Sequence, residues 1–142
     1  MTASIIIDEI SPEKIKVVLQ QSLREYNYNF FGPYELKRFA LYMQNNLAEI
    51  IAGIYGFILD KHSTVRLEFA WVREDSRKQG IGTKLFKRID EYALSNNCRY
   101  IQASTMEFQG PSFFEKMGYK PLGSIPKWFC DQDEIFFLKE VM

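Results

Sequence analysis

The chain has 142 residues, close to the usual size of a single domain, and a chain of this length buries about 68% of its unfolded surface on folding. Hydrophobic residues make up 46% of it and charged residues 25%, so disorder, collagen-like repeats and coiled coils are excluded. The 18 basic and 18 acidic residues balance, so no global field attracts nucleic acid or a membrane surface. We therefore expect one domain over residues 1–142, with neither nucleic acid nor a membrane among its partners.

The residue inventory also excludes two common catalytic classes. The cysteines Cys98 and Cys130 form no CxxC pair, and the single histidine, His62, has no partner for a zinc site or a Ser-His-Asp triad. We expect no metal, and we expect His62 in an exposed turn. The N-terminus lacks the basic and apolar regions of a signal peptide, and no apolar run is long enough for a membrane span. These features favour a cytoplasmic protein.

The first part of the chain predicts a strand, a helix and a loop. Residues 3–8 are rich in β-branched side chains and predict a short buried strand. Ser11 and Pro12 form a helix-start signal, and apolar residues at helical spacing extend the predicted helix to about residue 26. Residues 27–33 are rich in turn formers and aromatic residues, so we expect a loop over a cleft.

The centre of the chain predicts an antiparallel meander. Apolar and polar residues alternate over residues 36–44, and a long apolar strand follows at 49–59. Gly53 and Gly56 within that strand predict bends or a close approach of the backbone. A third strand is predicted over residues 64–72. Tight turns between three successive strands favour this arrangement over a βαβ array.

The last part of the chain alternates helices and strands. Apolar residues at helical spacing predict a helix over residues 82–94, and Pro111 and Gly118 mark the start and end of a short one. The remaining apolar runs predict three strands, at residues 99–105, 119–122 and 135–139. The order β-α-βββ-α-β-α-β-β predicts an α+β fold in which helices pack on a sheet.

The most informative segment leads from the third central strand into the following helix and contains Gly80 and Gly82. At a helix N-terminus the first backbone N–H groups lack intrahelical partners, and the helix dipole is positive there. Glycines let a phosphate approach without obstruction by a Cβ, so the turn predicts an anion cradle. Basic residues outnumber acidic ones between positions 73 and 90, which gives a local positive patch. The basic residues are Arg73, Arg77, Lys78, Lys84, Lys87 and Arg88.

The glycine turn does not match two commoner nucleotide-binding motifs. A Walker A loop requires a glycine where Arg77 stands, and a dinucleotide fingerprint requires a small residue where Leu85 stands. The absent Walker lysine and the absent acidic magnesium pair also argue against phosphoryl transfer. That Gly80 and Gly82 merely tighten a strand-to-helix turn stays open as an alternative.

Two motifs carry a resemblance to a known family. The pattern Arg77-x-x-Gly80-x-Gly82 resembles the acyl-CoA-binding motif of the GNAT superfamily of N-acetyltransferases, and residues 113–119 (FFEKMGY) are similar to its FYEKxGF element. Residues 105–111 (TMEFQGP) further resemble the TFxFQAP segment of a bacterial subgroup. The resemblance covers essentially the whole chain. It implies an α/β/α layered fold with a mixed, mostly antiparallel sheet of about six or seven strands, about three or four helices, and acetyl-CoA as cosubstrate.

The resemblance also implies where acetyl-CoA binds. The pyrophosphate would lie on the glycine turn, and the pantetheine arm would run between two splayed strands beside Trp71 and Val72. The backbone N–H near Val72 would polarise the thioester carbonyl, while Phe113 and Phe114 would flank the arm. Apart from this role, the bulky Trp71 is expected in the core. The implied residues of the turn are Arg77, Lys78, Gln79, Gly80, Ile81, Gly82 and Thr83.

Acetyl transfer to an amine requires a base, because an aliphatic ammonium has a pKa of about 10.4. Glu68 matches a position where some family members carry a proposed base. The alternation of the strand places it opposite Phe69 and Trp71, which fits a role toward the substrate. The alternative is a solvent-facing carboxylate paired with Arg66 or Lys61.

The family's usual general acid is a tyrosine, and Phe114 stands at that position. Ser112, Thr105 and Cys130 are fallback donors, while Tyr119 is expected to pack in the core. Neither cysteine has an activating base, so direct attack in a ternary complex is favoured over a ping-pong route. A catalytically weak or inactive relative that binds CoA or a partner protein stays open as an alternative.

The acceptor is expected to be a primary amine of a small molecule or a peptide. Specificity is expected in residues 27–36 and 121–134, the least patterned segments. Trp71 and Trp128 are candidates for the acceptor site, and a homodimer stays open. Cys98 is expected in the core at a strand start. A group of acidic residues is interpreted either as a surface for a cationic amine or as an ordinary solvated loop: Asp131, Asp133 and Glu134.

Overall fold

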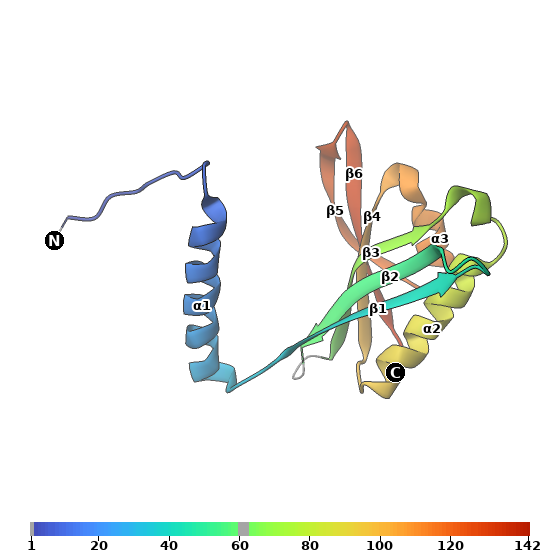
Figure 1. Cartoon of the computed structure of the whole chain (residues 1–142), viewed down its shortest axis with the longest axis horizontal. Coiled ribbons are helices and arrows are strands. Elements are labelled where there is room, and N and C mark those ends of the chain that lie inside the picture. Colours follow the sequence, from blue (N-terminus) through green and yellow to red (C-terminus); the bar gives the residue numbers. More distant parts are fainter. Residues whose placement is uncertain (1, 60–62) are drawn as a thin grey trace. The chain divides into compact units, whose positions relative to one another are not determined.

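The computed structural model describes residues 2–59 and 63–142, and the chain divides into two compact units, Met1–Tyr34 and Glu35–Met142. The first unit holds helix α1, and the second holds a β-sheet with two further α-helices (Figure 1). The turn expected at His62 lies outside the described residues. The expectation of one domain over residues 1–142 stays a prediction.

Helix α1 (Pro12–Phe31) begins where predicted and is longer than predicted, because it continues past residue 26. The carboxylate of Asp8 accepts the backbone N–H groups of Ile10 and Ser11 at 2.9 and 3.0 Å, and Pro12 opens the first turn. The helix ends at Gly32, whose N–H donates to the carbonyl of Tyr28 at 2.9 Å.

The loop predicted over residues 27–33 is therefore wrong in its first part. Residues 27–31 continue α1, because aromatic residues are tolerated in a helix and the break comes only with Gly32 and Pro33. The ring of Tyr34 packs edge-on against the ring of Tyr28 at 5.2 Å, and the Tyr28 hydroxyl donates to the Tyr34 carbonyl at 3.3 Å. These contacts hold the chain just after the helix.

The strand predicted over residues 3–8 is also wrong. These residues have no regular structure, and the side chains of Ile5, Ile6 and Ile7 are exposed. Their β-branched side chains favour an extended backbone, but a strand forms only when a neighbouring strand accepts its hydrogen bonds. No strand in the described part of the chain pairs with this segment.

The second unit is built on a six-stranded sheet in the order β1-β2-β3-β4-β6-β5. All neighbouring strands are antiparallel except β3 and β4, which are parallel. The predicted meander of three strands is confirmed, whereas the last two strands are longer than predicted because they form one hairpin. The strands are β1 (Leu36–Gln44), β2 (Ile50–Leu59), β3 (Thr64–Val72), β4 (Tyr100–Met106), β5 (Lys120–Phe129) and β6 (Gln132–Glu140).

Helices α2 (Ile81–Ser95) and α3 (Pro111–Lys116) lie on the same face of this sheet (Figure 1). Each follows a short 3₁₀ turn, η1 (Glu74–Ser76) before α2 and η2 (Glu107–Gln109) before α3. The apolar stripe of α2 is buried against the sheet, as its helical spacing requires. The stripe consists of Ile81, Leu85, Phe86, Ile89 and Ala93. The described residues thus form a mixed, mostly antiparallel sheet with three α-helices, and the predicted α+β fold is confirmed.

Candidate active site

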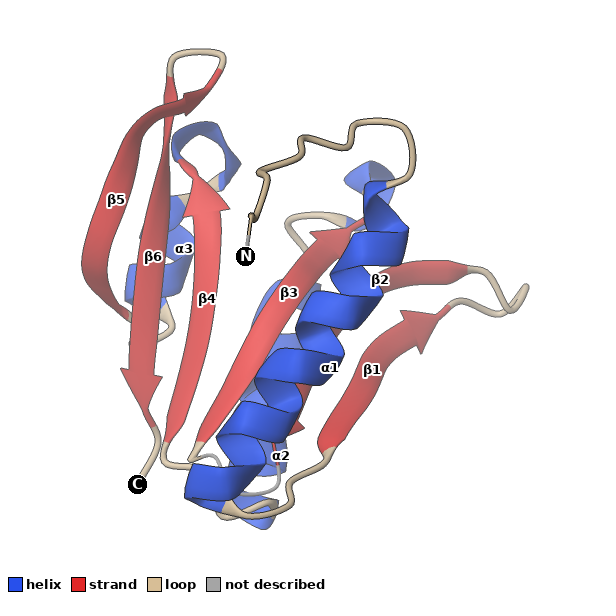
Figure 2. Cartoon of the chain, turned by 90° about the vertical axis from the view of Figure 1, so that its left-hand side faces the viewer, coloured by secondary structure: helices blue, strands red, loops and turns tan. Residues whose placement is uncertain are grey.

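The sheet opens between its two parallel strands. Strands β3 and β4 pair only at their beginnings, where Thr64, Val65 and Arg66 face residues 100–102. Beyond that point the strands diverge (Figure 2), while β4 stays paired with β6 along its other edge. The facing edges of residues 67–72 and 103–106 therefore carry backbone groups that pair with no strand in the described part of the chain. An extended ligand is able to bind such edges as an added strand does.

The backbone N–H of Val72 points into this opening. Successive N–H groups of a strand point to opposite edges. The N–H of Arg73 donates to the carbonyl of Ile51 on the β2 side at 2.8 Å. The N–H of Val72 therefore points toward β4, where an oxyanion donor was expected.

The glycine turn follows directly. Its backbone enters the left-handed region at Lys78, with φ of 62°, and at Gly80, with φ of 77°. The N–H of Arg77 bonds to the carbonyl of Glu74 at 3.3 Å, so this amide is not free for a ligand. The amides of residues 78–83, in contrast, meet no acceptor among the described residues, and the first amide of α2 in use is that of Lys84.

These free amides are the candidate anion cradle. Consecutive N–H groups that point to one side bind anions, and the N-terminus of a helix adds a positive field. A Cβ built on Gly80 meets no atom within 4 Å, so the space beside this residue is open. The cradle consists of Lys78, Gln79, Gly80, Ile81, Gly82 and Thr83, of which Ile81 also packs its side chain in the core.

Several side chains near the cradle support the turn itself. The Nε of Arg77 donates to the carbonyl of Val72 at 2.8 Å, and the amide of Gln79 donates to the carbonyl of Asp75 at 3.4 Å. Arg77 therefore ties the end of β3 to the cradle. The guanidinium of Arg73 is paired with carboxylates, so its charge adds less to the positive patch than the sequence alone indicated.

The two phenylalanines of α3 lie in different places. A Cβ on Gly82 would come within 3.3 Å of the ring of Phe113, so Gly82 lets α2 approach α3 closely. Phe113 is half-buried and its ring lies beside Gly82, while its role toward the pantetheine arm stays a prediction. Phe114 is only 9% exposed, and its ring stacks on Phe137 with centroids 5.2 Å apart. Phe114 is therefore a core residue, which does not favour the role beside the pantetheine arm.

A β-bulge places Glu68. Tyr55 pairs with Phe69 and Gly56 pairs with Leu67, so Glu68 is the extra residue between them. The bulge confirms the close approach predicted at Gly56, since a Cβ there would overlap the backbone of the facing strand.

The bulge also changes which side chains share a face. Leu67 is buried in the core, but Phe69 is 68% exposed and Trp71 is 49% exposed within this unit. The expected alternation, with all bulky side chains on one face, is therefore wrong beyond Leu67, and so is the expectation that Trp71 packs in the core. The extra residue shifts the later side chains to the other face.

The carboxylate of Glu68 has a partner that the sequence did not indicate. Its Oε1 lies 3.7 Å from Nη1 of Arg38 on β1, and Arg38 also donates to the hydroxyl of Tyr55 at 3.4 Å. Glu68 therefore pairs with Arg38 and not with Arg66, which was one predicted alternative. The other predicted partner, Lys61, lies outside the described residues. About a third of the Glu68 side chain is exposed, at 35%.

The expected core residues are confirmed. Cys98 is fully buried, and burial raises the pKa of its thiol, an effect that nearby Lys37 partly offsets. Tyr119 is 2% exposed, and burial followed by the charge of Asp90 raises the pKa of its hydroxyl. The Tyr119 hydroxyl is therefore a poor acid, and it has no hydrogen-bond partner among the described residues.

The fallback donors and the acidic group differ in their surroundings. Thr105 is buried, and its hydroxyl contacts the Gln109 side-chain oxygen at 3.3 Å, whereas Ser112 and Cys130 are exposed. The acidic group is not a plain loop. Asp133 is the second residue of β6, and its Oδ1 accepts the N–H of Lys127 at 2.9 Å. Trp128 is 57% exposed on the same hairpin.

The described residues contain no cluster of three or more potential metal ligands. They also contain no helix that is both long and apolar enough to cross a membrane.

The comparison with family models identifies the chain. Residues 5–119 match the model described as the acetyltransferase (GNAT) family. The chain belongs to this family, and the prediction of an N-acetyltransferase is confirmed at the family level. The narrower resemblance to a bacterial subgroup stays a prediction.

Two curated relatives have named substrates. The blasticidin-S acetyltransferase of Streptomyces morookaense is 28% identical over 94 residues, which is 66% of this chain and 68% of that protein. The thialysine N-epsilon-acetyltransferase of Bos taurus is 26% identical over 93 residues, which is 63% of this chain but only 55% of that protein.

Solved structures share the fold. A protein from Agrobacterium tumefaciens gives a TM-score of 0.86 at 20% identity and covers 97% of this chain and 99% of its own. An acetyltransferase from Bacillus cereus gives 0.78 at 26% identity, with coverage of 98% and 97%. Aminoglycoside 6'-N-acetyltransferase in complex with coenzyme A gives 0.64 at 18% identity, with coverage of 95% and 93%. GNAT homologues thus bind acetyl-CoA or CoA.

Proposed function

We propose that the protein transfers an acetyl group from acetyl-CoA to a primary amine by direct attack in a ternary complex. One observation carries the proposal: the free amides of residues 78–83 follow the end of β3, the end at which β3 no longer pairs with β4. A diphosphate bound on these amides would direct the pantetheine arm between the two strands. The thioester would then lie near the N–H of Val72, which would stabilise the oxyanion formed by attack.

Glu68 is the proposed base. Its carboxylate, directly or through a water molecule, would take a proton from the acceptor ammonium, and the neutral amine would then attack the thioester carbon. The tetrahedral intermediate would lose the extra proton on its nitrogen to solvent, collapse to the amide and release the CoA thiolate. Phe114 supplies no proton at the position of the usual acid, so solvent would protonate the thiolate. A thiol with a pKa of about 8.5 leaves readily enough for this route.

The acceptor is proposed to be the primary amine of a small molecule, and a peptide amine is the second candidate. The relatives named for blasticidin S and thialysine favour the small molecule. A panel of blasticidin S, thialysine, polyamines, aminoglycosides and peptides, read by thiol release, would find the acceptor. A cytoplasmic location and a homodimer stay predictions.

The alternative is a relative that binds CoA without turnover, as the phenylalanine at position 114 permits. Thermal stabilisation by acetyl-CoA, but not by ATP or NAD, would support both functions and exclude other nucleotide chemistry. Thiol release with any amine of the panel would then separate the enzyme from the binding module.

Substitution of Glu68 tests the base. In Glu68→Gln, turnover should fall most at low pH, where the acceptor amine is mostly protonated and depends most on a base. The measurement is kcat against pH for both proteins with the best acceptor. Equal rates at every pH would remove Glu68 from the mechanism.

A further inference from the structure

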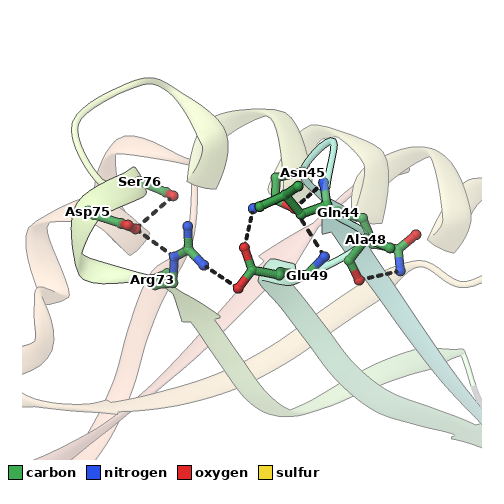
Figure 3. Close-up of polar contacts among 8 residues, drawn as sticks. Gln44, Asn45, Ala48, Glu49, Arg73, Asp75 and Ser76 are labelled. Atoms are coloured by element: carbon green, nitrogen blue, oxygen red, sulfur yellow. Dashed lines mark hydrogen bonds and ion pairs between the residues drawn. The ribbon is translucent and has the colours of Figure 1, made fainter.

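A network of polar contacts joins the loop before the cradle to the turn between β1 and β2 (Figure 3). Arg73 lies at its centre. Its Nε lies 2.6 Å from Oδ1 of Asp75, and its Nη1 lies 3.8 Å from Oε2 of Glu49. Its backbone N–H donates to the carbonyl of Ile51 at 2.8 Å. Arg73 thus connects the loop after β3 to the end of the turn between β1 and β2 and to the start of β2.

Glu49 is itself held in place. The side-chain amide of Asn45 donates to its Oε1 at 2.9 Å, and the Asn45 side-chain oxygen accepts its backbone N–H at 3.0 Å. The backbone N–H of Asn45 donates to the Glu49 carbonyl, also at 3.0 Å. The turn therefore presents the carboxylate of Glu49 in a fixed position toward Arg73.

On the other side, Asp75 belongs to the 3₁₀ turn that leads into the cradle. Its Oδ1 also accepts the hydroxyl of Ser76 at 3.1 Å, and the N–H of Ser76 bonds to the carbonyl of Arg73 at 2.9 Å. Ser76 is buried, at 7% exposed. The cradle begins two residues later, so a shift of this turn would move its amides.

We propose that Arg73 is a positioning residue. By bridging Glu49 and Asp75, it holds the amides of residues 78–83 in the geometry that receives the diphosphate of acetyl-CoA. The inference rests on the proposed function. Direct contact between Arg73 and a phosphate is the competing role. The structure favours positioning because two carboxylates already engage the guanidinium.

The ion pair between Arg73 and Asp75 persists at neutral pH. The hydrogen bond from Arg73 lowers the pKa of the Asp75 carboxyl, so the pair with Asp75 is lost only as the pH falls below the ordinary range of an aspartate. The pair between Arg73 and Asp75 should therefore cause no change in acetyl-CoA binding between about pH 6 and 8.

Three variants test the proposal: Arg73→Ala, Arg73→Lys and Glu49→Gln. Since the cradle binds a non-reacting part of acetyl-CoA, Arg73→Ala should raise the KM for acetyl-CoA by about 3- to 10-fold and leave kcat within about twofold. Arg73→Lys should restore part of the loss, because a lysine still pairs with one carboxylate. Glu49→Gln should raise the KM in the same direction.

The control is Arg99→Ala. Arg99 forms a comparable exposed ion pair with Glu140 at 2.7 Å. Arg99 lies just before the start of β4, whereas the cradle follows the end of β3. Because these two strands are parallel, the control pair and the cradle lie at opposite ends of the strands. The KM of Arg99→Ala should equal that of the wild type.

Glu49→Gln separates the two roles of Arg73. If Arg73 contacted a phosphate, removal of the competing carboxylate would leave the KM unchanged or lower it, and either result would overturn the proposal. Equal KM values for Arg73→Ala and the wild type would overturn it as well, while the proposed function would stand. A wild-type protein that is not stabilised by acetyl-CoA would remove the proposed function and the inference together.

Discussion

Replacement of Gly80 separates backbone strain from ligand obstruction. Gly80 has φ of 77° and no atom within 4 Å of a built Cβ. In Gly80→Ala the new methyl group meets no protein atom, so the loss of stability comes from the left-handed backbone and should be about 1–2 kcal/mol. Asparagine tolerates this conformation better, so Gly80→Asn should lose less.

Binding should respond differently from stability. Both variants place side-chain atoms in the open space of the cradle, so both should weaken acetyl-CoA binding by about tenfold or more, which corresponds to about 1.4 kcal/mol. Isothermal titration calorimetry gives the Kd, and a urea titration gives the free energy of unfolding. The asparagine variant should therefore lose affinity with little loss of stability.

Gly118→Ala is the matched control. Gly118 has φ of 93° and follows the C-terminus of α3, where a Cβ would lie 3.4 Å from the flexible side chain of Lys139. It should lose stability as Gly80→Ala does and bind acetyl-CoA as the wild type does. If Gly80→Asn bound acetyl-CoA with the wild-type Kd, the diphosphate would not lie on this turn and the reasoning would fail.

Three further predictions concern the core and the cysteines. Phe137 is fully buried and stacks on Phe114, so Phe137→Ala should lower the free energy of unfolding by about 3–5 kcal/mol in a urea titration; a loss below about 1 kcal/mol would contradict the packing. With a thiol reagent at pH 8, exposed Cys130 should react in the folded protein, whereas buried Cys98, whose pKa is raised, should react only after unfolding. The raised pKa keeps the Cys98 thiol protonated in the folded state. The contribution of this group to the free energy of unfolding should therefore be fully present below the ordinary thiol pKa of about 8.5 and decline as the pH rises above it. Immediate reaction of both thiols would refute the burial of Cys98.

The sequence predicts the elements whose signals are local. The α2 stripe, the glycine turn and the start of α3 at Pro111 follow from helical spacing, from Gly80 and from proline at a first helical position. The cradle could be predicted for the same reason, because free amides at a helix start depend on a few consecutive residues.

What the sequence could not predict depends on distant partners. Residues 3–8 have strand propensity but no pairing strand in the described part of the chain. The bulge at Glu68 arises where two strands meet, so the alternation of β3 alone gave the wrong face for Trp71. The bridge of Arg73 to Glu49 spans two loops, and only the run of charges at residues 73–75 hinted at it.

The most direct test of the central claim is a ¹H–¹⁵N NMR titration of the protein with acetyl-CoA. If the diphosphate binds on the cradle, the amides of residues 78–83 should show the largest shifts, and Val72 should shift as the thioester approaches. S-acetyl-N-acetylcysteamine, which carries the thioester but no diphosphate, should leave residues 78–83 unchanged. Saturating acetyl-CoA that shifts other amides and leaves residues 78–83 in place would contradict the account.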